Sequence, residues 1–114
     1  MVSLEAVKQL ALVFDDVIEL PHFEITSFRV KKKIFATLNT AENRACLKLS
    51  LIDQDVFCTT NNGIIYPVPN AWGKQGWTLI NLGKVKKAVF KDALSCAYRN
   101  VAPVKVNLQS GKFK

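Results

Sequence analysis

The chain has 114 residues, 49% of them hydrophobic and 22% charged, which fits one globular domain and leaves no room for a second. Its formal net charge of +7 is uneven, because residues 1–24 hold five acids and one lysine, whereas residues 25–114 hold fifteen lysines or arginines and four acids. Such a basic surplus favours polyanionic partners, namely nucleic acid, an anionic membrane surface or an acidic protein, although many small proteins carry it for solubility alone.

The sequence lacks the signals of export, membrane insertion and metal binding. No apolar run approaches the roughly 20 residues that cross a bilayer, and residues 1–10 lack the basic flank and apolar stretch of a secretion signal. We therefore expect a cytoplasmic protein that does not attach to a membrane. Cys46, Cys58 and Cys96 are odd in number and widely spaced, and His22 is the single histidine, so we expect free thiols, no metal and no cofactor.

The first predicted element is an amphipathic helix over residues 3–19. Apolar side chains recur there at helical spacing, Ser3 can cap the first turn, and Leu20-Pro21 ends the pattern. Three acids would then gather near the C-terminal end of this helix, where the helix dipole disfavours anions: Asp15, Asp16 and Glu19. Either a basic segment lies against them or they form a solvated acidic face.

After this helix the hydrophobic period changes to two, which predicts three consecutive strands. Phe23 is out of phase with Phe28, so we expect a bulge or a short turn near Thr26–Ser27. The strands over residues 33–39 and 44–50 alternate cleanly and are joined by a polar turn. Short connections of this kind favour an antiparallel meander.

The second half of the chain predicts a helix, two strands and a longer helix. Residues 51–60 follow a helix-capping pattern that begins at Ser50. Residues 63–69 are typical of a strand whose two prolines confine it to a sheet edge, and residues 76–82 predict the fifth strand. Residues 84–102 predict the last helix, which ends before a proline.

The expected fold class is therefore α+β, in the order α-β-β-β-α-β-β-α. It has two layers, with the helices packed on one antiparallel sheet. We place the domain at residues 1–103 and a basic C-terminal tail at residues 104–114.

The stretch Gly73-Lys74-Gln75-Gly76 has the form of the GxxG loop with which KH domains clamp an RNA backbone, and two tryptophans flank it. A KH loop joins two helices, whereas residues 77–82 are rich in aromatic and β-branched side chains and favour a strand. We therefore interpret the stretch as a flexible turn bounded by glycines. We expect Trp77 to pack in the core or on the sheet, and Trp72 either to cover the core or to form an exposed stacking platform.

Four stretches carry a resemblance to a known family: FRVKKKIFATL at 28–38, ACLKLS at 45–50, YPVPNAWGKQGWTLINL at 66–82 and ALSCAYRNVAP at 93–103. In this order they resemble the MmcQ/YjbR-like family of small bacterial proteins, whose fold is also described as double-wing and as related to secretion chaperones. The resemblance covers residues 3–103. The chain departs from many members in the NAWGKQGW stretch and in its C-terminal tail. The resemblance implies an α+β fold and DNA binding, with no established enzymatic activity or cofactor.

Two basic clusters are the candidates for nucleic-acid binding. Arg29 and Lys31–Lys33 lie at the junction of the first two strands, and alternation sends them to both faces of the sheet. The second cluster lies on one face of the last helix, where its first lysines oppose the helix dipole. A solvated lysine face would explain the same pattern. The residues that we predict to bind nucleic acid are Arg29, Lys31, Lys33, Trp72, Lys74, Lys84, Lys87, Lys91 and Tyr98.

The sequence offers little for catalysis. His22 and Glu24 are two residues apart and could pair, but no nucleophile stands in a recognisable motif, so we expect a protein that is not an enzyme. The favoured function is binding of nucleic acid, DNA rather than RNA, without sequence specificity. The alternative is a protein-interaction or chaperone-like module that binds an acidic protein, or a second copy of itself, through an open strand edge or the tail. We expect a monomer or a weak dimer.

Overall fold

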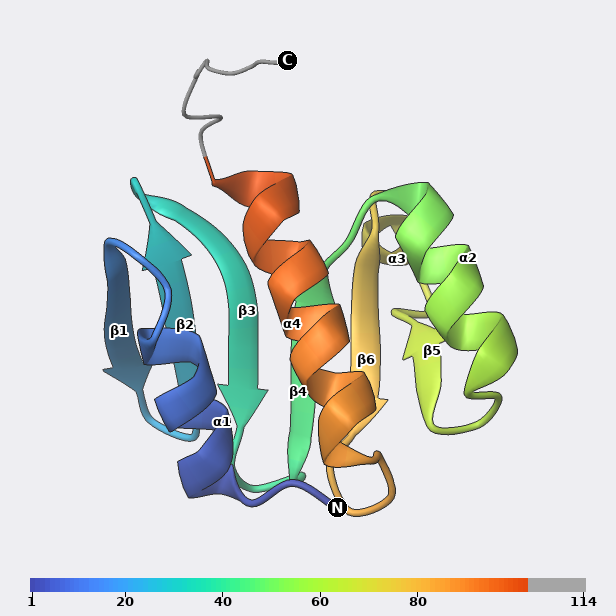
Figure 1. The fold of residues 1–114 in the computed structure, drawn as a ribbon, viewed down its shortest axis with the longest axis horizontal. Helices are drawn as coiled ribbons and strands as arrows, with labels where there is room; N and C mark the ends of the chain where they lie inside the picture. Colours follow the sequence, from blue (N-terminus) through green and yellow to red (C-terminus); the bar gives the residue numbers. More distant parts are fainter. Residues whose placement is uncertain (103–114) are drawn as a thin grey trace.

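The computed structural model describes residues 1–102 and places helices α1, α2 and α4 on one face of a six-stranded antiparallel sheet (Figure 1). The sheet has the order β1-β2-β3-β4-β6-β5. Its strands are β1 (Val17–His22), β2 (Ile25–Val30), β3 (Lys33–Asn39), β4 (Arg44–Lys48), β5 (Ile65–Pro67) and β6 (Trp77–Asn81). The helices are α1 (Leu4–Leu12), α2 (Leu51–Thr60), the single turn α3 (Ala71–Lys74) and α4 (Lys87–Val101). The predicted α+β class, with helices packed on one antiparallel sheet, is confirmed, whereas the tail at residues 104–114 lies outside the described part.

The core lies between the helices and one face of the sheet. Phe28 and Phe35 of the sheet and Phe90 of α4 are fully buried in it, and burial of each such side chain stabilises the fold by about 2–3 kcal/mol. Thr78 is the polar residue of β6 on this face. Its hydroxyl accepts a hydrogen bond of 3.1 Å from Gln54 Nε2 of α2 and donates one of 2.9 Å to the carbonyl of Gly76. These bonds let a polar side chain remain in the core with its hydrogen-bonding groups satisfied.

The N-terminal helix is shorter than predicted, and the segment that follows it is a strand. α1 ends at Leu12, and residues Val17–His22 pair with β2 as β1. Asp16 has a φ of 63°, a conformation that a right-handed helix cannot contain. The apolar residues at 17, 18 and 20 fit a strand as well as a helix, and pairing with β2 decides between the two. The element order therefore gains a strand after α1. Glu19 lies in that strand, whereas Asp15 and Asp16 lie in the turn that follows the C-cap of α1.

The irregularity that we predict near Thr26–Ser27 occurs on either side of these residues instead. β1 and β2 are joined by a tight turn at Phe23 and Glu24, in which Phe23 has a φ of 57°. The register between β2 and β3 shifts between Phe28 and Arg29. Thr26 itself is regularly paired with Leu38. The phase of the hydrophobic pattern therefore reveals that the strand is irregular, but it places the irregularity about two residues away from where it occurs.

The predicted flexible turn over residues 73–76 is wrong, because both glycines are held by close packing. Gly73 lies in α3, and a Cβ there would stand 1.9 Å from the carbonyl oxygen of Val68. Gly76 has a φ of 105°, and a Cβ there would stand 1.9 Å from the carbonyl oxygen of Leu49. The glycines are needed where backbones approach each other, so the connection from β5 to β6 is packed rather than loose.

The last helix begins three residues later than predicted. α4 starts at Lys87, after Lys86 at its N-cap, while Lys84 lies in the loop that leaves β6. Val85 is buried, which ties this loop to the core. Within residues 1–102, neither α4 nor any shorter helix is long and apolar enough to cross a membrane.

Candidate nucleic-acid interface

The sheet has a second face on which none of α1, α2 and α4 lies, and we call it the open face (Figure 1). Because side chains alternate along each strand, the pairing registers place one continuous row on this face across all six strands. The row consists of Leu20, Ser27, Thr37, Cys46, Leu79 and Tyr66, in the order of the sheet. Most of these side chains are half-buried by their neighbours, and the row is therefore a surface and not a second core.

The open face is basic. Arg29, Arg44 and Lys48 occupy it at strand positions that alternate with buried residues. Glu19 is the one carboxylate within the strands that the structure describes, and it faces the helices, where its Oε2 lies 3.7 Å from Nζ of Lys8. The strands therefore contribute three cations and no anion to the open face, and one of these cations, Arg44, is ion-paired with Glu42 of the β3–β4 turn.

The β2–β3 hairpin presents three lysines at one end of the sheet. Val30 pairs with Lys33, so Lys31 and Lys32 form a two-residue turn, in which their φ angles are 51° and 72°. Such turns normally contain asparagine and glycine, because other side chains are strained at positive φ. All three lysines are exposed, and Nζ of Lys31 lies 3.6 Å from a carboxylate oxygen of Asp16. This exposed ion pair contributes about 0–1 kcal/mol and leaves the lysine accessible.

Lys48 links this hairpin to the loop before β6. Its ammonium lies 5.7 Å from the ring centroid of Trp77 and donates a hydrogen bond to the carbonyl oxygen of Gln75. Lys33, Lys48, Gln75 and Asn100 also line a common shallow cavity of about 360 Å³. We call this part of the molecule the basic end and define it by Arg29, Lys31, Lys32, Lys33, Lys48 and Lys74.

Two of the predicted binding residues lie on α3, at the same end. Trp72 is 57% exposed, so it does not cover the core, and its backbone N–H donates to the Asn70 side chain at 2.8 Å. Lys74 is also exposed and directly precedes Gln75, the acceptor of the Lys48 bond. Trp77 packs on the sheet as expected, half-buried on its open face. An exposed tryptophan and a lysine therefore lie beside the basic end.

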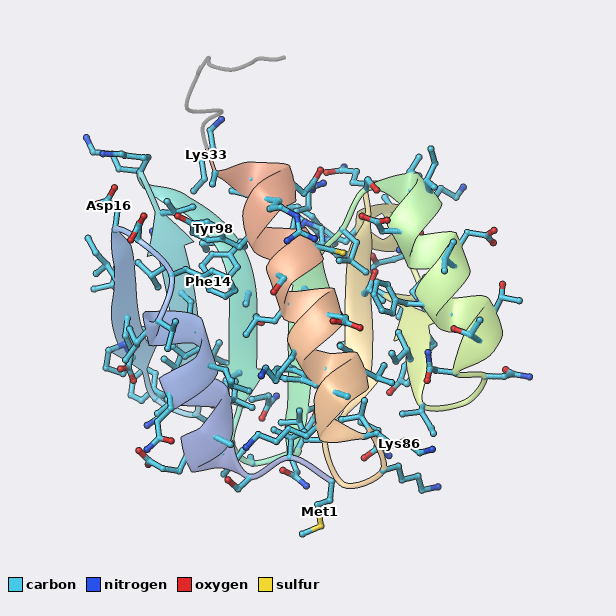
Figure 2. All side chains as sticks on the ribbon, viewed as in Figure 1. Met1, Phe14, Asp16, Lys33, Lys86 and Tyr98 are labelled. Carbon is cyan, nitrogen blue, oxygen red and sulfur yellow. The ribbon has the colours of Figure 1, made fainter. Side chains whose placement is uncertain are left out.

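The second predicted cluster lies elsewhere. Figure 2 shows Lys33 and Lys86 at opposite ends of the molecule, and Lys84 and Lys87 belong to the loop and the first turn beside Lys86. Lys91 borders a groove of about 290 Å³ between α4 and α1, lined by Leu10, Val13 and Phe14. The predicted residues therefore do not form one surface.

Tyr98 of α4 packs against aromatic side chains of the core. Its ring stacks on Phe14 with centroids 4.5 Å apart and meets Phe35 edge-on at 5.5 Å (Figure 2). Its hydroxyl donates a hydrogen bond of 2.8 Å to the carbonyl oxygen of Asp15. These contacts hold the segment after α1 against α4, and they orient the ring toward the core instead of toward a ligand.

Arg44 and Lys48 were not among the predicted binding residues. Residues 44–48 alternate, with Ala45 and Leu47 buried, so the remaining positions must face away from the helices. Interaction with the Tyr66 hydroxyl raises the pKa of Arg44, and the neighbouring carboxylate of Glu42 acts in the same direction. The signal was present in the sequence as alternation, but it is informative only once the uncovered face of the sheet is known.

The structure also places the groups considered for catalysis and metal binding. His22 lies on the open face at the end of β1, 4.6 Å from the ring of Phe23 between centroids. Burial raises the pKa of Cys46 to about 11, so its thiol is protonated at neutral pH. Across residues 1–102, no three histidine, cysteine, aspartate or glutamate side chains gather as metal ligands.

Comparison with known proteins identifies the family. The YjbR family model matches residues 12–100. The crystal structure of protein DR2400 from Deinococcus radiodurans, which contains a DUF419 domain, superposes with a TM-score of 0.76 at 17% sequence identity, covering 98% of this chain and 83% of that one. No curated protein matches the sequence. The similar structure shows the fold, and the family match, over most of the chain, shows that this protein belongs to the YjbR family, as the resemblance of its sequence motifs predicted.

Proposed function

We propose that this protein binds nucleic acid at its basic end, through contacts to phosphates that carry no sequence preference, and that it prefers DNA to RNA. The observation that carries the proposal is the turn of the β2–β3 hairpin. Two consecutive lysines occupy positive φ there, at 51° and 72°. Each such residue costs roughly 1–2 kcal/mol relative to glycine.

The strain supports a role for the positive charge of these lysines in binding, because other residues would form the same turn with a smaller loss of stability. An Asn-Gly pair forms the same two-residue connection without strain. The lysines keep three cations at an exposed tip, near Arg29 and Lys48. A flexible ammonium makes a point-charge contact to phosphate, which gives affinity and a salt dependence without reading bases.

The test is the double substitution Lys31→Asn with Lys32→Gly, which removes both charges and relieves the turn. We expect labelled DNA to bind the unchanged protein with an affinity that falls linearly in log salt. The slope should fall by about two in the variant, since each phosphate that a lysine no longer neutralises lowers it by roughly 0.9. Fluorescence anisotropy over a salt series measures both, with duplex and single-stranded DNA and RNA compared.

The matched control is Lys84→Gln with Lys86→Gln, which removes the same charge from the opposite end. The control should bind as the unchanged protein does. An equal decrease of affinity in both variants would show that net charge alone attracts DNA, and the proposed site would then be wrong.

A protein-interaction module remains the second candidate, because α2 carries apolar side chains that no described residue covers. Ile52 is 78% exposed, and Leu51 and Val56 lie beside it with more than half of their surface exposed. Isolated apolar residues are common on surfaces, but a group on one helix is typical of an interface. If self-association occurs there, sedimentation should show dimers that Ile52→Ser with Val56→Ser abolishes while DNA binding is kept.

A further inference from the structure

The open face is a candidate binding surface in its own right, next to the basic end. It spans six strands, and five inter-strand spacings of about 4.8 Å make it about 24 Å wide. Its strands bring cations and no carboxylate. On β6 and β5 it carries two half-buried aromatic side chains, Trp77 and Tyr66. A surface that combines positive charge with partly exposed aromatic rings matches a ligand that has both phosphates and bare bases.

The width of the face decides which form of nucleic acid it can hold. The major groove of duplex DNA is about 12 Å wide and admits a helix or a two-stranded ribbon, not a sheet about 24 Å across. The β2–β3 hairpin is narrow enough to reach a duplex, but the face behind it is too broad. An unpaired strand, by contrast, can lie on a sheet and stack its bases on aromatic side chains.

Two aromatic side chains on this face each have a cation next to them. Trp77 has the ammonium of Lys48 at 5.7 Å from its ring centroid. Tyr66 lies opposite Leu79 in the register and interacts through its hydroxyl with Arg44. A base that stacks on Trp77 would therefore have its phosphate near the Lys48 ammonium, whereas near Tyr66 the charge of Arg44 is shared with the Glu42 carboxylate. Stacking of this kind tolerates any sequence, because every base has a π-face.

We infer that the open face binds an unpaired strand of nucleic acid, which enters at the basic end and crosses β4, β6 and β5 with bases on Trp77 and Tyr66. The inference rests on the proposed function and specifies the ligand as single-stranded. Charge complementarity selects this occupant over a second copy of the chain. The face carries Arg29, Arg44 and Lys48, and it keeps a positive surplus although Arg44 is paired with Glu42, so two copies would repel each other.

The test places a negative charge in the middle of the face. Thr37 lies in the central row between Ser27 and Cys46, and Thr37→Glu introduces a carboxylate there. Thr59→Glu makes the same chemical change at an exposed position of α2, in the helix layer. Both variants of the full chain are compared by anisotropy with a labelled oligothymidylate and with a duplex of equal length. A second measurement uses Trp72→Phe, which leaves Trp77 as the sole tryptophan reporter.

We expect the single strand to bind about tenfold more tightly than the duplex and to quench the emission of Trp77. Thr37→Glu should weaken single-strand binding about tenfold relative to Thr59→Glu. If duplex binds as tightly, or the two glutamate variants bind the single strand equally and Trp77 emission does not change, the open face is not the binding surface. Should Thr37→Glu prevent folding, the emission of Trp77 decides alone.

These outcomes separate the inference from the function on which it rests. Binding that disappears in the Lys31→Asn, Lys32→Gly variant but is unchanged by Thr37→Glu would leave the basic end as the site and remove the open face. An absence of binding to any nucleic acid at low salt would overturn both.

Discussion

The two lysine clusters lie at opposite ends of the protein, and each of them destabilises its local structure for a different reason. At the β2–β3 hairpin the backbone is strained, since Lys31 and Lys32 have positive φ. At the start of α4 the helix is uncapped, because Lys86 makes no side-chain cap bond and Lys87 adds positive charge where the dipole is already positive. A cost in stability therefore does not by itself identify which lysines are functional, and the strain of the hairpin counts only together with its surroundings. What distinguishes the hairpin is its neighbours, Arg29 and Lys48, on an uncovered sheet face.

The largest change in stability should come from a substitution that disturbs the backbone beside the basic end. In Gly76→Ala the new methyl would stand 1.9 Å from the Leu49 carbonyl oxygen at a φ of 105°, so we expect the free energy of unfolding to fall by about 3 kcal/mol or more. Urea denaturation measures the change. Gly63→Ala is the control, because φ there is 83° but no atom lies within 4 Å, and it should cost about 1 kcal/mol. Equal decreases in the two variants would mean that the close approach to Leu49 relaxes freely.

A smaller effect, of opposite sign, is expected at the hairpin. Lys31→Asn with Lys32→Gly should raise the free energy of unfolding by about 1–2 kcal/mol, while DNA affinity falls. The relief of strain at two residues exceeds the loss of the Asp16 ion pair and the added freedom of glycine in the unfolded chain. Urea denaturation and anisotropy on the same preparation give the two values. A variant in which both stability and affinity fall would indicate that the lysines support the fold, and that their effect on binding is indirect.

The smallest change in stability is expected at the second lysine cluster, at the start of α4. Lys86→Asp supplies the missing N-cap of α4 and a favourable charge for its dipole, so we expect about 0.5–1 kcal/mol of added stability. Thermal unfolding followed by circular dichroism is sufficient to detect it. DNA binding should change little beyond the effect of net charge. A drop as large as that of the hairpin variant would instead assign the binding to the start of α4.

Much of the fold could be predicted from local pattern. β3, β4 and β6, together with α2, lie within about two residues of their predicted ranges, because each has one buried face and a clear period. β1 could not be predicted, because Val17 and Ile18 satisfy both periods and an aspartate at position 16 is only a weak sign of positive φ. Its pairing with β2 is a tertiary contact, and that contact outweighs the helical spacing.

The candidate site was predictable only in part. Arg29 and the three hairpin lysines stand together in the sequence, so composition finds them. Lys48 joins them through the pairing of β3 with β4, and Lys74 through the packed connection before β6. Contacts between segments this far apart in the chain are not encoded in local spacing, and the open face itself exists only because all three longer helices lie on the other side.

The position of the N-terminus has a practical consequence for how these measurements are designed. The Met1 ammonium donates to the Val85 carbonyl oxygen, and the Val2 N–H donates to the Leu82 carbonyl oxygen at 2.9 Å, so residue 1 lies beside Lys86 and far from Lys33 (Figure 2). α4, by contrast, ends at Val101, which lines the same cavity as Lys33 and Lys48. A purification tag or a surface-coupling group belongs at residue 1, where a fused amide can still donate to Val85 and the added chain leaves from the end opposite the proposed phosphate-binding surface.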